Sequence, residues 1–424
     1  MAIESDVLVV GGGLAGLTSA LAAARSGADT RLVSYKQSTL RSASGLVDLL
    51  GYTPDGDLVA NPHETIPDLP DSHPYRTVGV ESVRAAMDLF DDVAPRYRGE
   101  HTEANALVPT HGGTVKPTAR YPASAGAGLA SDDRDVLLVG LAEMVDFDAG
   151  HAAAHLESAG VPFETRGVTI RFPGDLRADA KVTRYAKLLD SDAAVAVDGR
   201  RRPARRALAE RVKGHLDGEE RVGFPAILGD DDPAAVREEL ADHLGTDVFE
   251  VPMGPPSLPG LRLEDALFAA LDEAGASIET GNPVVGYDGE ERIEQVYVEK
   301  NGAHIPNSAD QYVLATGGLV GKGLASDRED VTEPVFGCHV ASPGDRYEWF
   351  DGDAFGDHPF ARFGLDTDDE LRPTDGDGFP EFENLRAAGS VLGGYDFPAE
   401  KSGSGVSLAT GYVAGQGATR EVAR

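Results

Sequence analysis

The first forty residues alternate apolar runs with glycine-rich or polar breaks, in the order of a strand–helix–strand unit. The apolar run at residues 6–10 predicts a strand buried in a parallel sheet. Residues 17–26 predict a helix that ends at Gly27, and residues 30–33 predict a second strand. This order is typical of the start of a Rossmann-like α/β fold.

The same alternation continues along the chain. It predicts further helices at residues 81–97, 148–159, 232–243 and 258–274. It predicts further strands at residues 136–139, 224–228, 275–279, 284–287, 293–300, 304–305 and 312–316. Residues 177–221 are polar and arginine-rich, and the pattern assigns no element there. The last 42 residues predict a strand from Glu383 that opens onto a glycine turn, then an Ala- and Gly-rich helix from Gly405 onward.

The strongest motif is GxGxxG at residues 11–16, between the first strand and the first helix. In this context the first glycine makes a tight turn, and the second lets the backbone approach a phosphate. The third lets the helix pack closely on the strand. The phosphate would lie at the helix N-terminus, where N–H groups favour an anion. Two later glycine turns and the start of the last helix could complete a nucleotide site. The candidate cofactor-binding residues are Gly11, Gly12, Gly13, Leu14, Ala15, Gly16, Ser34, Thr316, Gly317, Gly389, Ser390 and Gly405.

One position departs from the usual dinucleotide pattern. An Asp or Glu at the end of the second strand normally binds the adenosine ribose, but this chain has Ser34 there, and the next acid, Asp48, lies well beyond it. Either a dinucleotide anchored by serine binds, or the ligand is a mononucleotide such as FMN.

Composition and charge narrow the function further. The chain of 424 residues carries 71 acidic and 38 basic residues, a net charge of −33, and only eight of the basic residues are lysine. This surface is typical of a protein adapted to molar salt, where the Debye length is about 3 Å. The negative charge disfavours binding to nucleic acid and direct adsorption to an anionic membrane.

The lone cysteine, Cys338, excludes a cysteine-bound cluster in this chain and lies in an apolar stretch that favours a packing role. We expect no metal site, no signal peptide, no membrane span and a cytoplasmic location.

Taken together, the motifs resemble the two-dinucleotide-binding-domain flavoproteins built like fumarate reductase. More closely, the chain resembles the B subunits of anaerobic glycerol-3-phosphate dehydrogenases, in a haloarchaeal-type version. The segments that carry this resemblance are collinear and span nearly the whole chain, although residues 170–245 match little. They are residues 11–17, 44–50, 54–56, 73–75, 255–257, 260–263, 371–373, 383–385 and 389–394.

The resemblance implies a fold and a domain organisation. We expect a discontinuous Rossmann-like flavin-binding domain formed by residues 1–104, 245–330 and 378–424. Residues 105–244 and 331–377 would form an inserted cap, facing substrate or a partner.

The resemblance also implies a function. Such dehydrogenases oxidise sn-glycerol 3-phosphate to dihydroxyacetone phosphate and pass electrons to quinone. The B subunit is assigned FMN, with FAD as the alternative. The catalytic A subunit has FAD, and the iron–sulfur C subunit fixes the complex to the inner face of the membrane. Two alternatives remain: a self-sufficient FAD-dependent oxidoreductase of the fumarate-reductase class, and a structural partner that has lost its flavin.

The catalytic base is unassigned. A flavin-linked alcohol oxidation needs a group that accepts the hydroxyl proton, and the histidine candidates are His63, His73, His111 and His339. A substrate phosphate needs arginine or lysine. Arg262 and Arg372 are the candidates within family-like segments, followed by Lys116 and Arg120.

Overall fold

The chain divides into two compact units. Unit 1 comprises Met1–Thr39, Asp48–Pro95 and Asp265–Arg424, and unit 2 comprises Leu40–Val47 and Arg96–Glu264. The computed structural model describes residues 2–36, 38–174, 176–177, 180–197, 199–255 and 257–422. Pro256, in a segment that carries the family resemblance, lies outside the described residues, as do positions 423–424 of the predicted last helix.

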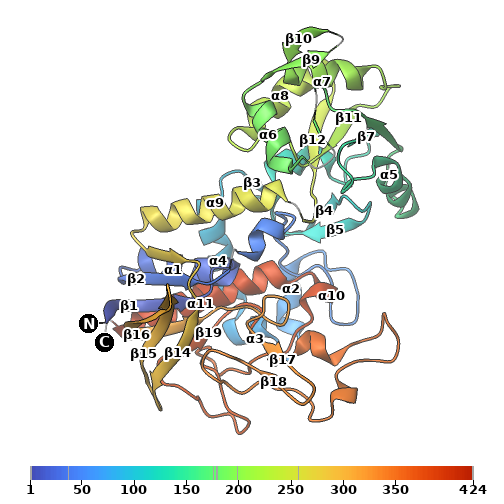
Figure 1. Cartoon of the computed structure of the whole chain (residues 1–424). Coiled ribbons are helices and arrows are strands. Elements are labelled where there is room, and N and C mark those ends of the chain that lie inside the picture. The colour runs from blue at the N-terminus through green and yellow to red at the C-terminus, as the bar shows by residue number, and fades with distance from the viewer. Residues whose placement is uncertain are drawn as a thin grey trace. The chain divides into compact units, whose positions relative to one another are not determined.

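Unit 1 is built on a seven-stranded sheet (Figure 1). Its parallel strands lie in the order β13-β2-β1-β16-β19, which is the Rossmann order 3-2-1-4-5. An antiparallel pair, β14 and β15, extends the sheet from β16. The strands are β1 (Ile3–Val10), β2 (Thr30–Ser34), β13 (Ser277–Thr280), β14 (Val284–Gly289), β15 (Ile293–Lys300), β16 (Ala303–Leu314) and β19 (Leu385–Ala387).

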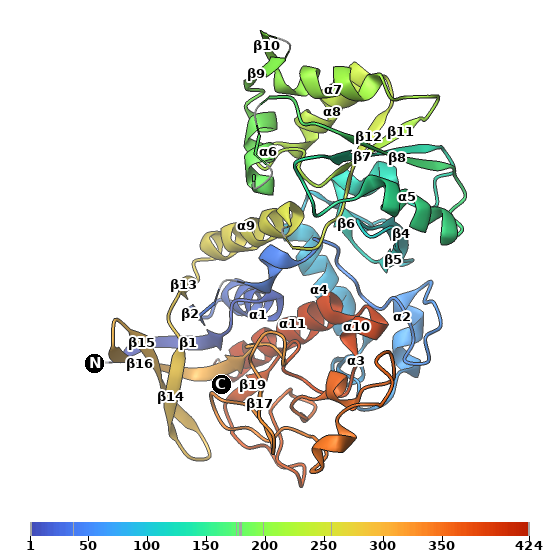
Figure 2. The same ribbon diagram turned by 45° about the vertical axis from the view of Figure 1, so that its right-hand side comes forward.

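Helices cover one face of this sheet. The last helix, α11 (Gly403–Val422), packs along α1 (Leu14–Arg25) and on β1, β16 and β19, as Figure 2 shows in red and blue. Small residues permit this approach: a Cβ on Gly411 would lie 2.5 Å from the Ala15 carbonyl oxygen, and one on Gly415 would lie 2.3 Å from that of Ser19. The other helices of unit 1 are α2 (Pro62–Thr65), α3 (Pro74–Val78), α4 (Val80–Val93) and α10 (Phe397–Glu400), while α9 (Leu258–Glu273) runs across the division between the units.

The opposite face of the sheet is covered by the long segment before β19. Phe336, Cys338, Phe363 and Phe382 share one buried cluster with apolar residues of β1, β16 and β19. For this reason residues 331–377 group with unit 1 in the structure, whereas the family resemblance placed them with the insert. Between β16 and β19 the chain contains two short strands, β17 (Ala325–Ser326) and β18 (Val331–Thr332), and two short 3-10 helices, at Arg346–Glu348 and Pro359–Arg362. Burial raises the pKa of the Cys338 thiol well above its usual value.

Unit 2 has its own four-stranded parallel sheet in the order β12-β11-β7-β8. In chain order this is 4-3-1-2, the arrangement of a small doubly wound unit. Its strands are β7 (Val136–Leu141), β8 (Thr165–Ile170), β11 (Arg221–Pro225) and β12 (Asp247–Val251), and its helices are α5 (Ala149–Ser158), α6 (Val182–Asp190), α7 (Ala204–Lys213) and α8 (Pro233–Leu244). Short strand pairs complete it: β3 (Tyr97–Arg98) with β6 (Tyr121–Pro122), β4 (Ala106–Pro109) with β5 (Val115–Thr118), and β9 (Ala194–Val197) with β10 (Arg200–Pro203).

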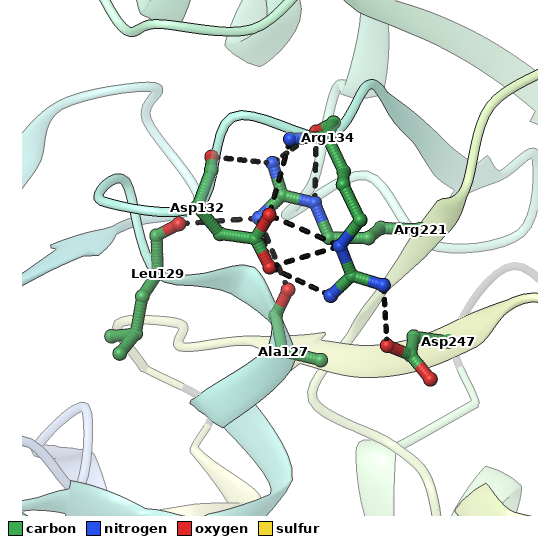
Figure 3. Close-up of polar contacts among 6 residues, drawn as sticks. All are labelled: Ala127, Leu129, Asp132, Arg134, Arg221 and Asp247. Atoms are coloured by element: carbon green, nitrogen blue, oxygen red, sulfur yellow. Dashed lines mark hydrogen bonds and ion pairs between the residues drawn. The ribbon is translucent and has the colours of Figure 1, made fainter.

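A buried arginine ties the start of β11 to the loop before β7 (Figure 3). The Arg221 side chain has no exposed surface, and its guanidinium donates to the carbonyl oxygens of Ala127, Leu129, Asp132 and Arg134. Asp132 in turn accepts from Arg134, and that hydrogen bond lowers the pKa of Asp132 to about 2. Because Arg221 opens β11, this network lies at the amino edge of the sheet, away from the edge where such folds bind ligands.

The predicted elements were confirmed in most places, with three corrections. The strand predicted at 224–228 is β11 at Arg221–Pro225, displaced towards the N-terminus because Arg221 is buried as part of it. The arginine-rich region without an assigned element contains α6, β9, β10 and α7. The segments predicted at 304–305 and 312–316 form the single strand β16.

Candidate functional site

Three glycine turns meet at the carboxyl edge of the unit 1 sheet. The turn after β1 lies against the turn after β16, since a Cβ on Gly11 would lie 2.1 Å from the Ala315 carbonyl oxygen. Gly11 also has a φ of +124°, which favours glycine. The turn after β19 joins them: the Gly318 N–H donates to Ser390 Oγ at 3.1 Å. Since β1 and β16 flank the point where the strand order reverses, this edge is where doubly wound folds bind nucleotides.

The N-terminus of α1 is suited to a phosphate. Gly13 is its N-cap and offers no side-chain acceptor to the helix N–H groups, and the first turn contains no acidic residue. A Cβ on Gly13 would have no heavy atom among the described residues within 4 Å. In contrast, a Cβ on Gly16 would lie 1.9 Å from the Gly11 carbonyl oxygen, so this glycine packs helix on strand. Leu14 and Ala15 begin the helix and are buried.

A buried hydroxyl group lies at the end of β16. Thr316 Oγ1 has no hydrogen-bond partner among the described residues, although it is shielded from solvent. The next residue, Gly317, has a φ of +88°. An unpartnered buried hydroxyl is costly unless a ligand completes it. Together with the open side of Gly13, it makes this edge of the sheet suited to a phosphate-bearing ligand, and a flavin is one such ligand.

Ser34 lies where the sequence pattern placed it, at the end of β2 beside the glycine turn. A Cβ on Gly12 would lie 2.6 Å from Ser34 Oγ. The Ser34 hydroxyl donates to the Lys36 carbonyl oxygen at 2.9 Å. The structure therefore brings Gly11–Gly16 and Ser34 together, and it brings Thr316, Gly317, Gly389 and Ser390 to the same edge of the sheet.

The start of α11 has a different environment from the one expected. The Gly405 N–H donates to the Asp48 carbonyl oxygen at 2.7 Å. A Cβ on Gly405 would lie 2.1 Å from Tyr75 Oη and 2.6 Å from Leu49 Cδ1. Close packing thus accounts for glycine at this position, and a role of Gly405 in cofactor binding stays a prediction.

A buried polar cluster stands directly before α11. His73 Nε2 lies 3.1 Å from Glu400 Oε2, and His73 Nδ1 accepts the Tyr75 N–H, so the ring proton lies on Nε2 and is donated to Glu400. Glu400 also accepts from the Ser402 hydroxyl and from the Asp396 N–H, both at 3.0 Å. These contacts connect the start of α3 to the start of α11.

Burial and hydrogen bonding compete within this cluster. Burial disfavours the charge of Glu400, but the hydrogen bond from His73 and the contacts with Asp396 and Ser402 prevail and lower its pKa. Burial raises the pKa of Tyr75 and of Tyr395 well above the usual value. Sequence reasoning missed Glu400, because nothing in the sequence connects it to a histidine 327 positions away.

The other histidine candidates are scattered. His63 is half-buried in α2, and His339 is exposed, with its N–H donating to Glu381. His111 belongs to unit 2, where its Nδ1 accepts the Gly254 N–H at 3.3 Å. None of these contacts selects a catalytic base.

The predicted substrate-binding arginines both have carboxylate partners. The buried Arg262 pairs with Glu250 at 2.7 Å in unit 2, and it also donates to the Gly229 carbonyl oxygen. In unit 1, Arg372 pairs with Asp368 at 2.8 Å. A role for either in binding a substrate phosphate stays a prediction. Of the weaker candidates, Arg120 donates to the Gly99 and Ala119 carbonyl oxygens, and Lys116 lies in β5.

A family model described as FAD binding domain matches residues 6–406. A protein from Halobacterium salinarum, named as the probable B subunit of anaerobic glycerol-3-phosphate dehydrogenase, is 71% identical over 424 residues, which cover 100% of this chain and 99% of the relative. The chain belongs to this family of B subunits, within the flavoproteins that share the FAD-binding domain. Another member, from Pectobacterium atrosepticum, is 31% identical over 95% of this chain and 96% of that protein. The predicted family and the Rossmann-like α/β fold are therefore confirmed.

Solved structures resemble the chain only distantly. An E. coli quinol fumarate reductase matches 100% of this chain and 71% of that chain at 12% identity, with a TM-score of 0.43.

In the part of the chain that the structure describes, no helix has the length and apolar character needed to cross a bilayer.

Proposed function

We propose that the chain is the flavin-carrying B subunit of a quinone-linked glycerol-3-phosphate dehydrogenase. The reaction would oxidise sn-glycerol 3-phosphate to dihydroxyacetone phosphate, releasing two electrons and two protons. The observation that carries this proposal is the 71% identity to such a B subunit over the whole length of both chains. The glycine-lined edge of the unit 1 sheet supports the same proposal, because it fits a flavin phosphate.

A bound flavin supplies an acceptor of two electrons that can release them singly to iron–sulfur clusters. The residues of this chain would bind and orient it. The N–H groups at the start of α1 would hold the phosphate beside Gly13, and Thr316 would offer its hydroxyl. The His73–Glu400 pair would fix the start of α11.

We propose that substrate oxidation depends on a separate FAD-bearing catalytic subunit, which is the A subunit that the family resemblance implies. This chain would relay electrons towards an iron–sulfur subunit. Both predicted phosphate-binding arginines already bind carboxylates, which supports this division. The iron–sulfur subunit would fix the complex to the inner face of the membrane and deliver electrons to quinone. In its absence, we expect the chain to leave the membrane fraction after cell lysis.

The test of this proposal is a dye-reduction assay in molar KCl with glycerol 3-phosphate, and with glycerol as the control that lacks the phosphate. We expect little activity from the chain alone and strong, phosphate-dependent activity when the catalytic subunit is added. Full activity of the chain alone would instead identify a self-sufficient oxidoreductase. A colourless, folded chain that leaves the activity of the catalytic subunit unchanged would identify a structural partner.

We propose FMN as the specific flavin. Ser34 replaces the acid that binds an adenosine ribose, and its hydroxyl already donates to Lys36. The experiment is a titration of the flavin-free chain with FMN and with FAD, followed by fluorescence quenching. Tighter binding of FMN is the expected result, and a clear preference for FAD would contradict it.

A further inference from the structure

One loop of unit 1 exposes an unusual number of aromatic side chains. Residues 342–363 contain six of the 28 aromatic residues of the chain, including its only tryptophan. Four of them face solvent: Tyr347 is 75% exposed, Phe350 47%, Phe355 98% and Phe360 43%. We call residues 342–363 the aromatic loop. Large exposed apolar groups gathered in one segment are a sign of an interaction surface.

The aromatic loop is closed at its base and anchored in the core. A β-bridge joins Ala341 to Gly364, with the Ala341 N–H donating at 3.2 Å. Trp349 packs edge-on against Phe363 at 5.8 Å and donates from its indole N–H to the Pro343 carbonyl oxygen at 2.7 Å. Phe363 belongs to the buried cluster that covers the sheet. The loop therefore directs two aromatic rings inward and four outward.

Internal hydrogen bonds fix the outward-facing part. Asp345 accepts the Tyr347 N–H at 2.9 Å, and Asp353 accepts the Phe355 N–H at 3.1 Å. The Asp351 N–H donates to His358 Nδ1 at 3.0 Å, and His358 stacks on Phe360. A loop ordered in this way loses little conformational entropy on binding. A larger share of the free energy gained by burying its exposed rings therefore contributes to affinity.

Charge indicates what covers the loop. It carries five acidic residues and two arginines, and unit 1 as a whole carries 43 acidic and 16 basic residues. In molar salt this charge acts only over about 3 Å, but at a contact the acidic groups of a second copy of this chain or of an anionic membrane would still lie against those of the loop and oppose binding. A protein with an apolar pocket edged by arginine and lysine would complement it, and aromatic centres with charged rims are the usual anatomy of protein interfaces.

We infer that the aromatic loop is the docking surface for a partner subunit of the dehydrogenase, which presents such an apolar pocket edged by basic side chains. The choice of a dehydrogenase partner rests on the proposed function. Phe355 is the expected anchor, because almost its whole side chain is exposed in the unbound chain. The acidic residues of the loop would face the basic edge of the pocket.

The test is assembly of the full complex. The tagged chain is co-expressed with the catalytic and the iron–sulfur subunits, and the recovery of each per tagged chain is measured in molar KCl. Variants are F355S, F350S/F355S and, as a matched control, V145S, which removes a side chain of unit 2 that is 85% exposed. Flavin per chain and Tm report on folding, and F355S removes a ring too exposed to support the fold.

We expect F355S to lower the recovery of one partner at least tenfold and F350S/F355S to lower it further, with flavin content and Tm unchanged. V145S should assemble like the wild type. Assembly of F350S/F355S at the wild-type level would overturn the docking proposal alone, while the proposed function would stand. A wild-type chain that assembles with neither partner would overturn both.

Two further measurements test whether a second copy of the chain or a membrane binds the aromatic loop. Sedimentation of the isolated chain tests self-association, and flotation with phosphatidylglycerol vesicles tests membrane binding. Self-association or vesicle binding that is present in the wild type and lost in F355S would overturn the proposal, because it would identify a second copy or a lipid surface as the occupant. We expect neither.

Discussion

Units 1 and 2 share an architecture but differ in what stands at the ends of their strands. Both have a parallel sheet whose strand order reverses beside the first strand, β1 in unit 1 and β7 in unit 2. In unit 1 a glycine turn follows that strand and leaves open space at the N-cap of a helix. In unit 2 the Asp148 side chain caps the following helix, α5, by accepting the His151 N–H at 3.0 Å. The topology of the sheet places the helix N-terminus at the edge where a ligand can bind. The residues of the turn determine whether the N–H groups of that terminus are free for the ligand or are already capped by a side chain.

The two units also differ in charge. Unit 1 carries 43 acidic and 16 basic residues, while unit 2 carries 28 and 22. In unit 2 several arginines bind carboxylates or backbone carbonyls, as Arg221 and Arg205 do. The net charge of the chain is therefore concentrated in the unit that bears the candidate flavin site. The arginines of unit 2 therefore stabilise its fold, whereas the acidic surface belongs mainly to unit 1.

The largest expected effect comes from the Gly13→Asp substitution in unit 1. The new side chain would have open space and would cap α1, which stabilises a helix by about a few tenths of a kcal/mol relative to glycine at the N-cap. Its carboxylate would occupy and repel the phosphate position. We expect flavin content to fall at least tenfold while the flavin-free protein keeps or gains stability, measured by absorbance and thermal unfolding.

Gly150→Asp is the matched control in unit 2. It places the same charge in the first turn of α5, where the nearest contact of a Cβ is 3.5 Å from Asp148 Oδ1. We expect this variant to keep its flavin. Equal flavin loss in both variants would remove the distinction between the two helix termini.

Arg221→Met should have the largest effect on stability in unit 2. The variant would remove a fully buried guanidinium and leave four carbonyl oxygens without their donor, at a cost of about 3–5 kcal/mol. Chemical unfolding would measure the loss, and limited proteolysis would locate it in unit 2. A cost below about 1 kcal/mol would show that the network in Figure 3 is not a structural anchor.

Removal of salt should act mainly on unit 1. Lowering KCl from molar to millimolar concentration lengthens the Debye length from about 3 Å to about 30 Å or more and restores repulsion among the acidic residues. We expect a decrease in Tm of about 10 °C, corresponding to a few kcal/mol, with the first proteolytic cleavages in unit 1. An unchanged Tm would contradict an adaptation to high salt.

Glu400→Gln should have the smallest effect, about 1–2 kcal/mol, because it weakens the hydrogen bond from His73. The pKa of Glu400 is lowered in the folded state, so its stabilisation is present above the unfolded pKa near 4 and is lost as pH falls through the folded value. We therefore expect wild type and variant to differ at pH 6 and to converge below pH 4. A difference that stays constant across this range would show that ionisation of Glu400 is not involved.

The sequence predicts the parts of this molecule that depend on local pattern. Gly11–Gly16 and the apolar run before it identify β1, the turn and α1 without further information. Long-range partners are not encoded locally. The pairing of His73 with Glu400 and the burial of Arg221 appear only when distant segments fold together. The helices α6 and α7 were missed because their arginines dilute the apolar periodicity, although Tyr185 and Leu208 are fully buried.

The flavin content of the purified chain tests the candidate site most directly. Acid release and chromatography in molar KCl would identify the flavin and count it per chain. We predict one FMN for each chain in the wild type and almost none in Gly13→Asp. A folded wild-type chain that binds neither FMN nor FAD would show that the glycine-lined edge of unit 1 is not a flavin site.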